Sequence, residues 1–153
     1  MKSAAKTSTN ALTLTIKRFD TQLPLPQKAT AQSVGYDLYA RETTTILPGE
    51  VGLVPLNAAL KPPAGYWILL AARSSLQKKG VNLANGVGIG DPDYCGDGDE
   101  YRAALFNFSS QPVTIERGDR IVQMILMQLV SAQVVEVEKL EEKDRGGFGS
   151  TGK

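Results

Sequence analysis

The stretch that decides the fold is NGVGIGDPDYCG, which runs from Asn85 to Gly96. Glycine alternates with valine and isoleucine up to Gly90, and a turn that contains proline follows. This pattern predicts a strand that ends in a tight turn, with glycines where another group approaches the backbone closely. Asp91 would lie at the end of that strand, beside a slot lined by backbone, where a carboxylate can act as a general base on water. The alternative is a surface hairpin whose acidic residues only contact solvent, and the stretch alone leaves both interpretations open.

The composition narrows the classes of chemistry that the chain can perform. Its 153 residues are typical of one domain with a hydrophobic core. It contains no histidine and one cysteine, Cys95, which excludes imidazole-based catalysis, an internal disulfide framework and a cysteine-ligated zinc site. The net charge of +1 gives no indication of binding to nucleic acid or to an anionic membrane. No apolar run approaches the roughly 20 residues of a membrane span, and an apolar signal core is missing, so we expect a cytoplasmic protein.

Short segments that alternate apolar and polar residues, or that are rich in β-branched residues, recur between glycine and proline turns. They predict strands at residues 12–17, 34–40, 43–47, 51–56, 66–70, 87–90, 101–108, 120–130 and 133–139. We expect residues 101–108 to pair with residues 87–90 as a hairpin, and residues 133–139 to form an outer strand. Ser74 or Ser75 would cap a single helical turn that Gly80 ends. This organisation favours an all-β barrel or sandwich with one short helix.

Polar residues outside the opening stretch are candidates for binding an anionic ligand. Arg73, Ser74 and Ser75 stand at the start of the predicted helical turn, where a guanidinium and free amides favour phosphate. The alternative is an ordinary capped turn with a surface arginine. Gln123 is polar within an apolar strand and needs a partner, either a ligand or a neighbouring strand. Asp37 stands alone in its strand, and by itself it is typical of a surface acid.

The C-terminal segment is rich in glycine and is not expected to hold structure alone. Phe148 stands between two glycines and is followed by Ser150 and Thr151. An aromatic ring can stack on a nucleobase, and glycine amides with hydroxyls can surround phosphates. We therefore expect a tail that becomes ordered over a ligand.

Five stretches, taken in order, resemble the five motifs of the trimeric dUTP diphosphatases (dUTPases). They are Val34 to Ala40, Arg73 to Leu76, Asn85 to Gly96, Arg117 to Gln123 and Gly146 to Gly152. The resemblance implies a distorted jelly-roll-like β-barrel that assembles as a homotrimer with active sites at the subunit interfaces. It divides the chain into a flexible tail at residues 1–10, a barrel domain at residues 11–140 and a C-terminal arm at residues 141–153. The arm of one subunit would close over a site formed by the others.

The resemblance also implies a reaction, which is the hydrolysis of dUTP to dUMP and pyrophosphate with Mg²⁺. Such a reaction limits uracil in DNA and supplies dUMP for dTTP synthesis. Asp91 would be the general base for attack of water on the α-phosphorus, and Asp37 would hold the metal through its water shell. The implied binding residues are Arg73, Ser74, Ser75 and Gln123 for the phosphates, Asn85, Ile89 and Arg102 for uracil, Tyr94 for the sugar, and Phe148 stacking over uracil. Arg145, Ser150 and Thr151 would hold the γ end, and Gly90 and Gly149 would also contact the substrate.

The chain departs from the family pattern at three places. Gly90 stands where the family more often has an apolar β-branched residue, and the segment from Cys95 to Glu100 is longer than the usual Arg-Gly-Glu. Arg145 lies closer to Phe148 than is usual. Two rivals remain: a dCTP deaminase of the same fold, which would lack the glycine-rich tail, and a non-catalytic nucleotide-binding regulator, which would be expected to lose Asp91, Tyr94 or the tail. We expect dUTP and other copies of the chain as partners, without nucleic acid or membrane.

Overall fold

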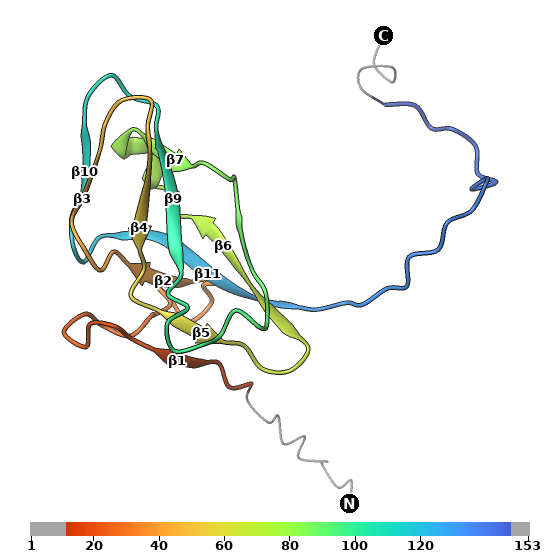
Figure 1. The fold of residues 1–153 in the computed structure, drawn as a ribbon, viewed down its shortest axis with the longest axis horizontal. Helices are drawn as coiled ribbons and strands as arrows, with labels where there is room; N and C mark the ends of the chain where they lie inside the picture. Colours follow the sequence, from red (N-terminus) through yellow and green to blue (C-terminus); the bar gives the residue numbers. More distant parts are fainter. Residues whose placement is uncertain (1–11, 148–153) are drawn as a thin grey trace, which may run out of the picture.

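Eleven short strands and one 3-10 turn form the fold of residues 12–147, the part of the chain that the computed structural model describes (Figure 1). The strands are β1 (Thr15–Lys17), β2 (Tyr36–Tyr39), β3 (Thr44–Ile46), β4 (Val51–Pro55), β5 (Ala59–Lys61), β6 (Tyr66–Ala72), β7 (Val81–Leu83), β8 (Gly88–Gly90), β9 (Arg102–Asn107), β10 (Val113–Ile115) and β11 (Arg120–Gln128). The turn is η1 (Leu76–Lys79). The all-β prediction with one short helix is confirmed. Within residues 12–147 the structure has no helix that could span a membrane.

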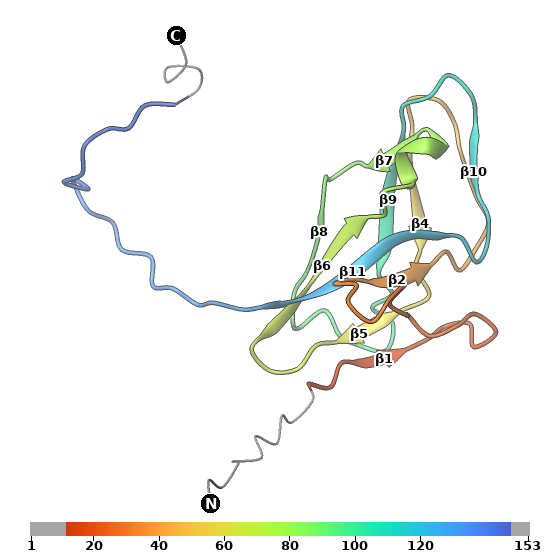
Figure 2. The ribbon, with the colours of Figure 1, turned by 180° about the vertical axis from the view of Figure 1, so that it is seen from behind.

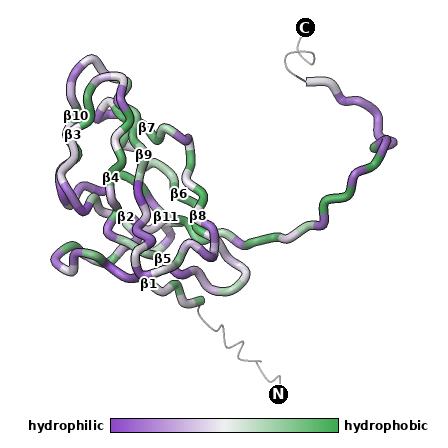
Figure 3. The backbone as a smooth tube through the Cα atoms, in the orientation of Figure 1, coloured by the Kyte–Doolittle hydropathy of each residue, from purple (hydrophilic) through white to green (hydrophobic). Residues whose placement is uncertain are grey.

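Two larger sheets enclose the hydrophobic core. The first has the order β2-β11-β6-β8 and the second has the order β4-β9-β7, and all of their pairs are antiparallel. Two smaller sheets, β1-β5 and β3-β10, close the ends. Figure 2 shows β11 running along the back of the barrel between β2 and β6. The inward residues of facing strands, such as Leu38, Ile68, Leu105 and Val122, are fully buried, and the hydrophobic segments of the tube in Figure 3 converge on this interior.

The predicted hairpin between residues 87–90 and 101–108 is wrong. β8 pairs with β6, whereas β9 pairs with β4 on one side and with β7 on the other. The connection that follows β8 is too long and too irregular to act as a hairpin turn, since it contains no regular strand from Asp91 to Tyr101. The two strands therefore diverge, and the space between them becomes a pocket.

The predicted outer strand at residues 133–139 is also wrong for the isolated chain. No strand occurs between residues 129 and 147, and this segment leaves the barrel as an extended arm (Figure 1). Alternation of valine and glutamate indicates the two faces of a strand, but this segment pairs with no strand within residues 12–147. Strands β5, β7 and β10, of three residues each, were not predicted.

Candidate functional site

A pocket of about 280 Å³ lies between the diverging strands β8 and β9. Its lining consists of Leu70, Asn85, Gly88, Ile89, Tyr94, Glu100, Tyr101 and Arg102. Four residues expected to contact one nucleoside, namely Asn85, Ile89, Tyr94 and Arg102, are therefore brought together here. β8 is the last strand of its sheet, so the backbone groups along its outer edge have no strand partner. A flat heterocycle that enters the pocket meets backbone donors and acceptors of the kind that a further strand would use.

Asp91 directly follows β8, at the end of this wall, and it is exposed to solvent. The turn after it is closed by a backbone hydrogen bond of 3.1 Å from the Tyr94 amide to the Asp91 carbonyl. A carboxylate at this position is accessible to water and stands on a backbone fixed by the pairing of β8 with β6. The sequence-based expectation that Asp91 ends a strand is confirmed.

Tyr94 is held above the pocket by two contacts. Its hydroxyl donates a hydrogen bond of 3.2 Å to the carbonyl oxygen of Glu100. Its ring meets the ring of Tyr101 edge to face, with centroids 5.3 Å apart and an interplanar angle of 73°, which is a favoured geometry for aromatic pairs. Tyr94 is partly exposed and lines the pocket, so part of its side chain is accessible to a ligand.

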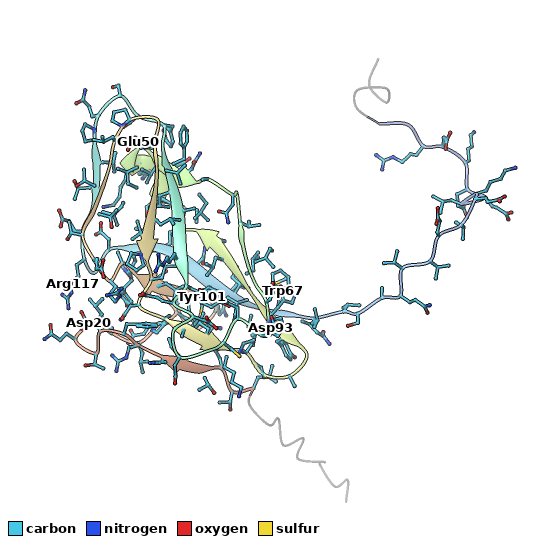
Figure 4. All side chains as sticks on the ribbon, viewed as in Figure 1. Asp20, Glu50, Trp67, Asp93, Tyr101 and Arg117 are labelled. Carbon is cyan, nitrogen blue, oxygen red and sulfur yellow. The ribbon has the colours of Figure 1, made fainter. Side chains whose placement is uncertain are left out.

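Tyr101 explains why position 90 is a glycine. Its side chain is only 4% exposed, within the barrel in Figure 4, and a Cβ added to Gly90 would lie 2.2 Å from the Tyr101 hydroxyl oxygen. Within the described residues this hydroxyl has no hydrogen-bond partner. Burial raises the pKa of Tyr101 to about 12, so the phenol stays protonated at neutral pH. Tyr101 thus fills the space that an apolar residue at position 90 would otherwise occupy.

Glu100 anchors the far end of the same loop. Its side chain is 6% exposed, and it accepts hydrogen bonds from Arg41 Nε at 2.8 Å, from Arg41 Nη2 at 3.0 Å and from the backbone amide of Asn57 at 3.0 Å. These bonds with Glu100 raise the pKa of the Arg41 guanidinium above its ordinary value. Asn57 in turn accepts hydrogen bonds from the amides of Phe19 and Asp20. The loop that carries Tyr94 is therefore tied to the barrel through a buried ion pair, which the sequence analysis missed.

A second polar cluster lies beside a smaller pocket of about 160 Å³. Its lining consists of Ala29, Ser33, Gly35, Asp37, Arg73, Ser74 and Gln123. Asp37 is not the surface acid that its sequence context indicates, because it is 6% exposed and lies between two arginines. Its Oδ1 is 2.9 Å from Arg73 Nε, and its Oδ2 is 3.2 Å from Arg120 Nη1. The register of the β2–β11 pair places Asp37 opposite Gln123, so both residues line this pocket.

The predicted N-cap position of η1 is confirmed at Ser75, but the capping hydrogen bond expected from its hydroxyl is not formed. Of the two serines, only Ser74 reaches the smaller pocket. Gly80, with φ at 82°, ends the turn as predicted. The hydroxyl of Ser75 is therefore not used by the turn itself.

Neither pocket lining includes Gly90 or Arg145, which were also predicted to contact the substrate. Arg145 lies on the exposed arm, and Phe148, Gly149, Ser150 and Thr151 lie outside the described residues. Within residues 12–147 no three His, Cys, Asp or Glu side chains converge as a metal-binding group. Asp37 uses each oxygen for one arginine. A carboxylate oxygen has two lone pairs, so Asp37 retains acceptor capacity for a metal-bound water and fits an indirect role better than direct ligation.

Comparison with known proteins agrees with this geometry. The dUTPase family model matches residues 21–152. The deoxyuridine 5'-triphosphate nucleotidohydrolase of Caldanaerobacter subterraneus is 40% identical over 149 residues, which cover 93% of this chain and 99% of that one. The crystal structure of the dUTPase from Streptococcus mutans superposes with a TM-score of 0.71 at 32% identity, over 78% of this chain and 98% of that chain. The dUTPase of Staphylococcus bacteriophage 80alpha with dUPNHPP reaches a TM-score of 0.80 at 23% identity, over 92% and 98% of the two chains, which shows the fold.

The all-β fold is thus shared with proteins that are named as dUTPases or deoxyuridine 5'-triphosphate nucleotidohydrolases. The chain belongs to the dUTPase family.

Proposed function

We propose that the chain is a dUTP diphosphatase, which hydrolyses dUTP to dUMP and pyrophosphate in the cytoplasm. The observation that carries this proposal is the β8–β9 pocket, which combines an unpaired backbone edge, Tyr94 at its opening and Asp91 at the end of its wall. In this assignment uracil enters the pocket and pairs with the backbone of β8 and β9 near Ile89 and Arg102. Asn85 would also contact uracil from the start of the same wall. The product would supply dUMP for dTTP synthesis, and removal of dUTP would limit uracil in DNA.

Asp91 acts as the general base. Water attacks the α-phosphorus, Asp91 accepts the proton, and pyrophosphate leaves. An ordinary carboxylate can perform this step, because phosphoryl transfer depends mainly on positioning and on neutralising charge. The fixed backbone at the end of β8 supports the positioning part of this requirement.

The polar cluster around Asp37 would receive the phosphates. Arg73 brings a guanidinium that can bind phosphate oxygens in bidentate fashion, and Ser74 and Gln123 bring neutral donors to the same small pocket. Asp37 would orient Mg²⁺ through a water molecule, and the ion when bound would neutralise charge on the phosphates. Ser75, exposed and free of a capping bond, would add a further donor.

A homotrimer is proposed because residues 133–140 expose several apolar side chains to solvent. Val134 is 96% exposed and Leu140 is 84% exposed, which is unfavourable for a segment that alternates valine and glutamate. Pairing of residues 133–139 with a sheet edge of another copy would bury these side chains and complete a barrel domain of residues 11–140. The arm at residues 141–153 would then bring Arg145, Phe148, Gly149, Ser150 and Thr151 to a site on a neighbouring copy. The tail predicted at residues 1–10 lies outside the described residues.

The test is to incubate the purified protein with Mg²⁺ and, separately, with dUTP, dCTP, dTTP or UTP. Pyrophosphate and nucleotide products are then measured by chromatography. Release of dUMP and pyrophosphate from dUTP alone is expected. A deaminated product from dCTP would assign the chain to a deaminase of the same fold, and tight binding of dUTP without turnover would indicate a regulator.

A further inference from the structure

Tyr94 depends on its neighbours for its position above the pocket. It stands in an irregular loop, and its side chain is 42% exposed. Its hydroxyl bond to the Glu100 carbonyl fixes one end of the ring. The edge-to-face contact with Tyr101, at 5.3 Å, supports the ring itself.

Tyr101, which supports the ring of Tyr94, is itself held in place by its neighbours. It directly follows Glu100, whose side chain is bound to Arg41 and to the Asn57 amide. Its hydroxyl oxygen lies against Gly90, the residue before Asp91, closely enough that no side chain could be added there. Tyr101 therefore contacts both the strand end that carries Asp91 and the ring of Tyr94.

We propose that Tyr101 is a positioning residue for sugar selection, which sets the height of the Tyr94 ring over the pocket and thereby excludes a 2'-hydroxyl. The inference rests on the proposed function, with Tyr94 packed against the sugar as the family resemblance implies. A side chain that only fills the core would affect all ligands of the pocket equally. A side chain that holds Tyr94 affects the preference for deoxyribose over ribose, because a 2'-hydroxyl is excluded only while the ring stays close to the sugar.

The experiment measures the dissociation constants of dUMP and UMP by isothermal titration calorimetry, so that it does not depend on turnover. In Tyr101→Leu the aromatic support is lost, and we expect the ratio of the UMP to the dUMP dissociation constant to fall by about tenfold. This is a part of the roughly hundredfold by which a pocket can reject an added hydroxyl. Tyr101→Met removes the ring but keeps more volume, and it is measured beside the leucine variant in case the latter fails to fold. The ratio should fall in the same direction.

Two controls separate this role from a general loss of stability. Tyr101→Phe keeps the edge-to-face contact and should keep the ratio within about twofold of the wild type, since it removes only the hydroxyl. Tyr66→Leu removes a partly buried tyrosine at the start of β6, away from the pocket lining, and should also leave the ratio unchanged.

The outcomes are decisive in both directions. An unchanged ratio in a folded Tyr101→Leu or Tyr101→Met variant overturns the inference, and so does a wild type that binds dUMP and UMP equally. A fall in Tyr101→Phe as large as in Tyr101→Leu would assign the effect to the hydroxyl and also overturn it. Failure of the wild type to hydrolyse dUTP would refute the proposed function without changing the result for nucleotide binding, so the two failures are distinguishable.

Discussion

Replacement of Arg41 by methionine tests the buried ion pair that anchors the loop of Tyr94. The variant leaves the Glu100 carboxylate, 6% exposed, with only the Asn57 amide among its three observed donors. Removing one partner of a buried pair typically costs about 3–5 kcal/mol. The Arg41 side chain is 29% exposed, so water can reach the vacated space, and we expect the lower end, about 3 kcal/mol.

The assay is equilibrium unfolding in urea at neutral pH and one fixed protein concentration. With a slope of about 1–3 kcal/mol per molar urea, the midpoint should fall by about 1–3 M while the slope stays constant. Lys17→Met is the matched control, because it removes an exposed pair with Asp97, and it should cost about 1 kcal/mol or less. A loss below about 1 kcal/mol in Arg41→Met would refute the claim that Glu100 is anchored by Arg41.

Three further predictions follow from single contacts. Tyr101→Phe should raise the free energy of unfolding by about 1 kcal/mol at pH 8, because it removes a buried hydroxyl that has no partner among residues 12–147. Since the folded pKa of Tyr101 is raised to about 12, wild-type stability should also fall between pH 10 and about 12, and urea unfolding should show no such component in the variant. The hydrogen bond from Arg117 lowers the pKa of Asp20. The ionised Asp20 therefore stabilises the folded chain above pH 3.8, the ordinary pKa, and this stabilisation is lost as the pH falls below that value. Acid unfolding of Asp20→Asn, followed by circular dichroism, should lack this loss of stability. Gly35→Ala would place a Cβ 2.3 Å from Gln123 Oε1. This overpacking should lower the free energy of unfolding by about 1–3 kcal/mol, and it should reduce the rise in melting temperature that dUTP produces. An unaltered rise would contradict the placement of Gln123 in the phosphate site.

The ion pair behind the Asp20 prediction is visible in Figure 4, where Arg117 lies next to Asp20 at the edge of the barrel. Arg117 Nη2 is 2.6 Å from Asp20 Oδ2. The two residues are 97 positions apart in the chain, so no local sequence pattern could have paired them.

Local pattern was sufficient for the strands that alternate or that carry many β-branched residues. β11 was predicted from its long apolar run and β8 from its alternating glycines, because each pattern lies within the strand itself. The motif resemblance then identified residues that line the β8–β9 pocket, such as Asn85 and Tyr94, although their spacing alone left a surface hairpin equally possible.

Long-range contacts account for what the sequence analysis missed. The sequence context of Asp37 indicates a surface acid, because its two arginine partners come from other strands and loops. Glu100 ends the segment from Cys95 that is longer than in the family, and its hydrogen bonds with Arg41 and Asn57 hold it within the barrel. Gly90 departs from the family pattern. Tyr101, eleven residues further on, occupies the space that a side chain at position 90 would take. A signal existed in the pairing of a small residue with a large one, but only a structure shows that the two positions touch.

The most direct test of the proposed function compares wild type with Asp91→Asn for release of pyrophosphate from dUTP in the presence of Mg²⁺. The variant keeps the shape of the side chain and removes the base, so we expect its turnover to fall by about 10²–10⁴-fold while the dissociation constant of dUMP stays the same. Wild-type turnover of dUTP to dUMP and pyrophosphate, lost in the variant, is the predicted result. Equal turnover by both proteins would show that Asp91 is not the base and would contradict the mechanism proposed for this site.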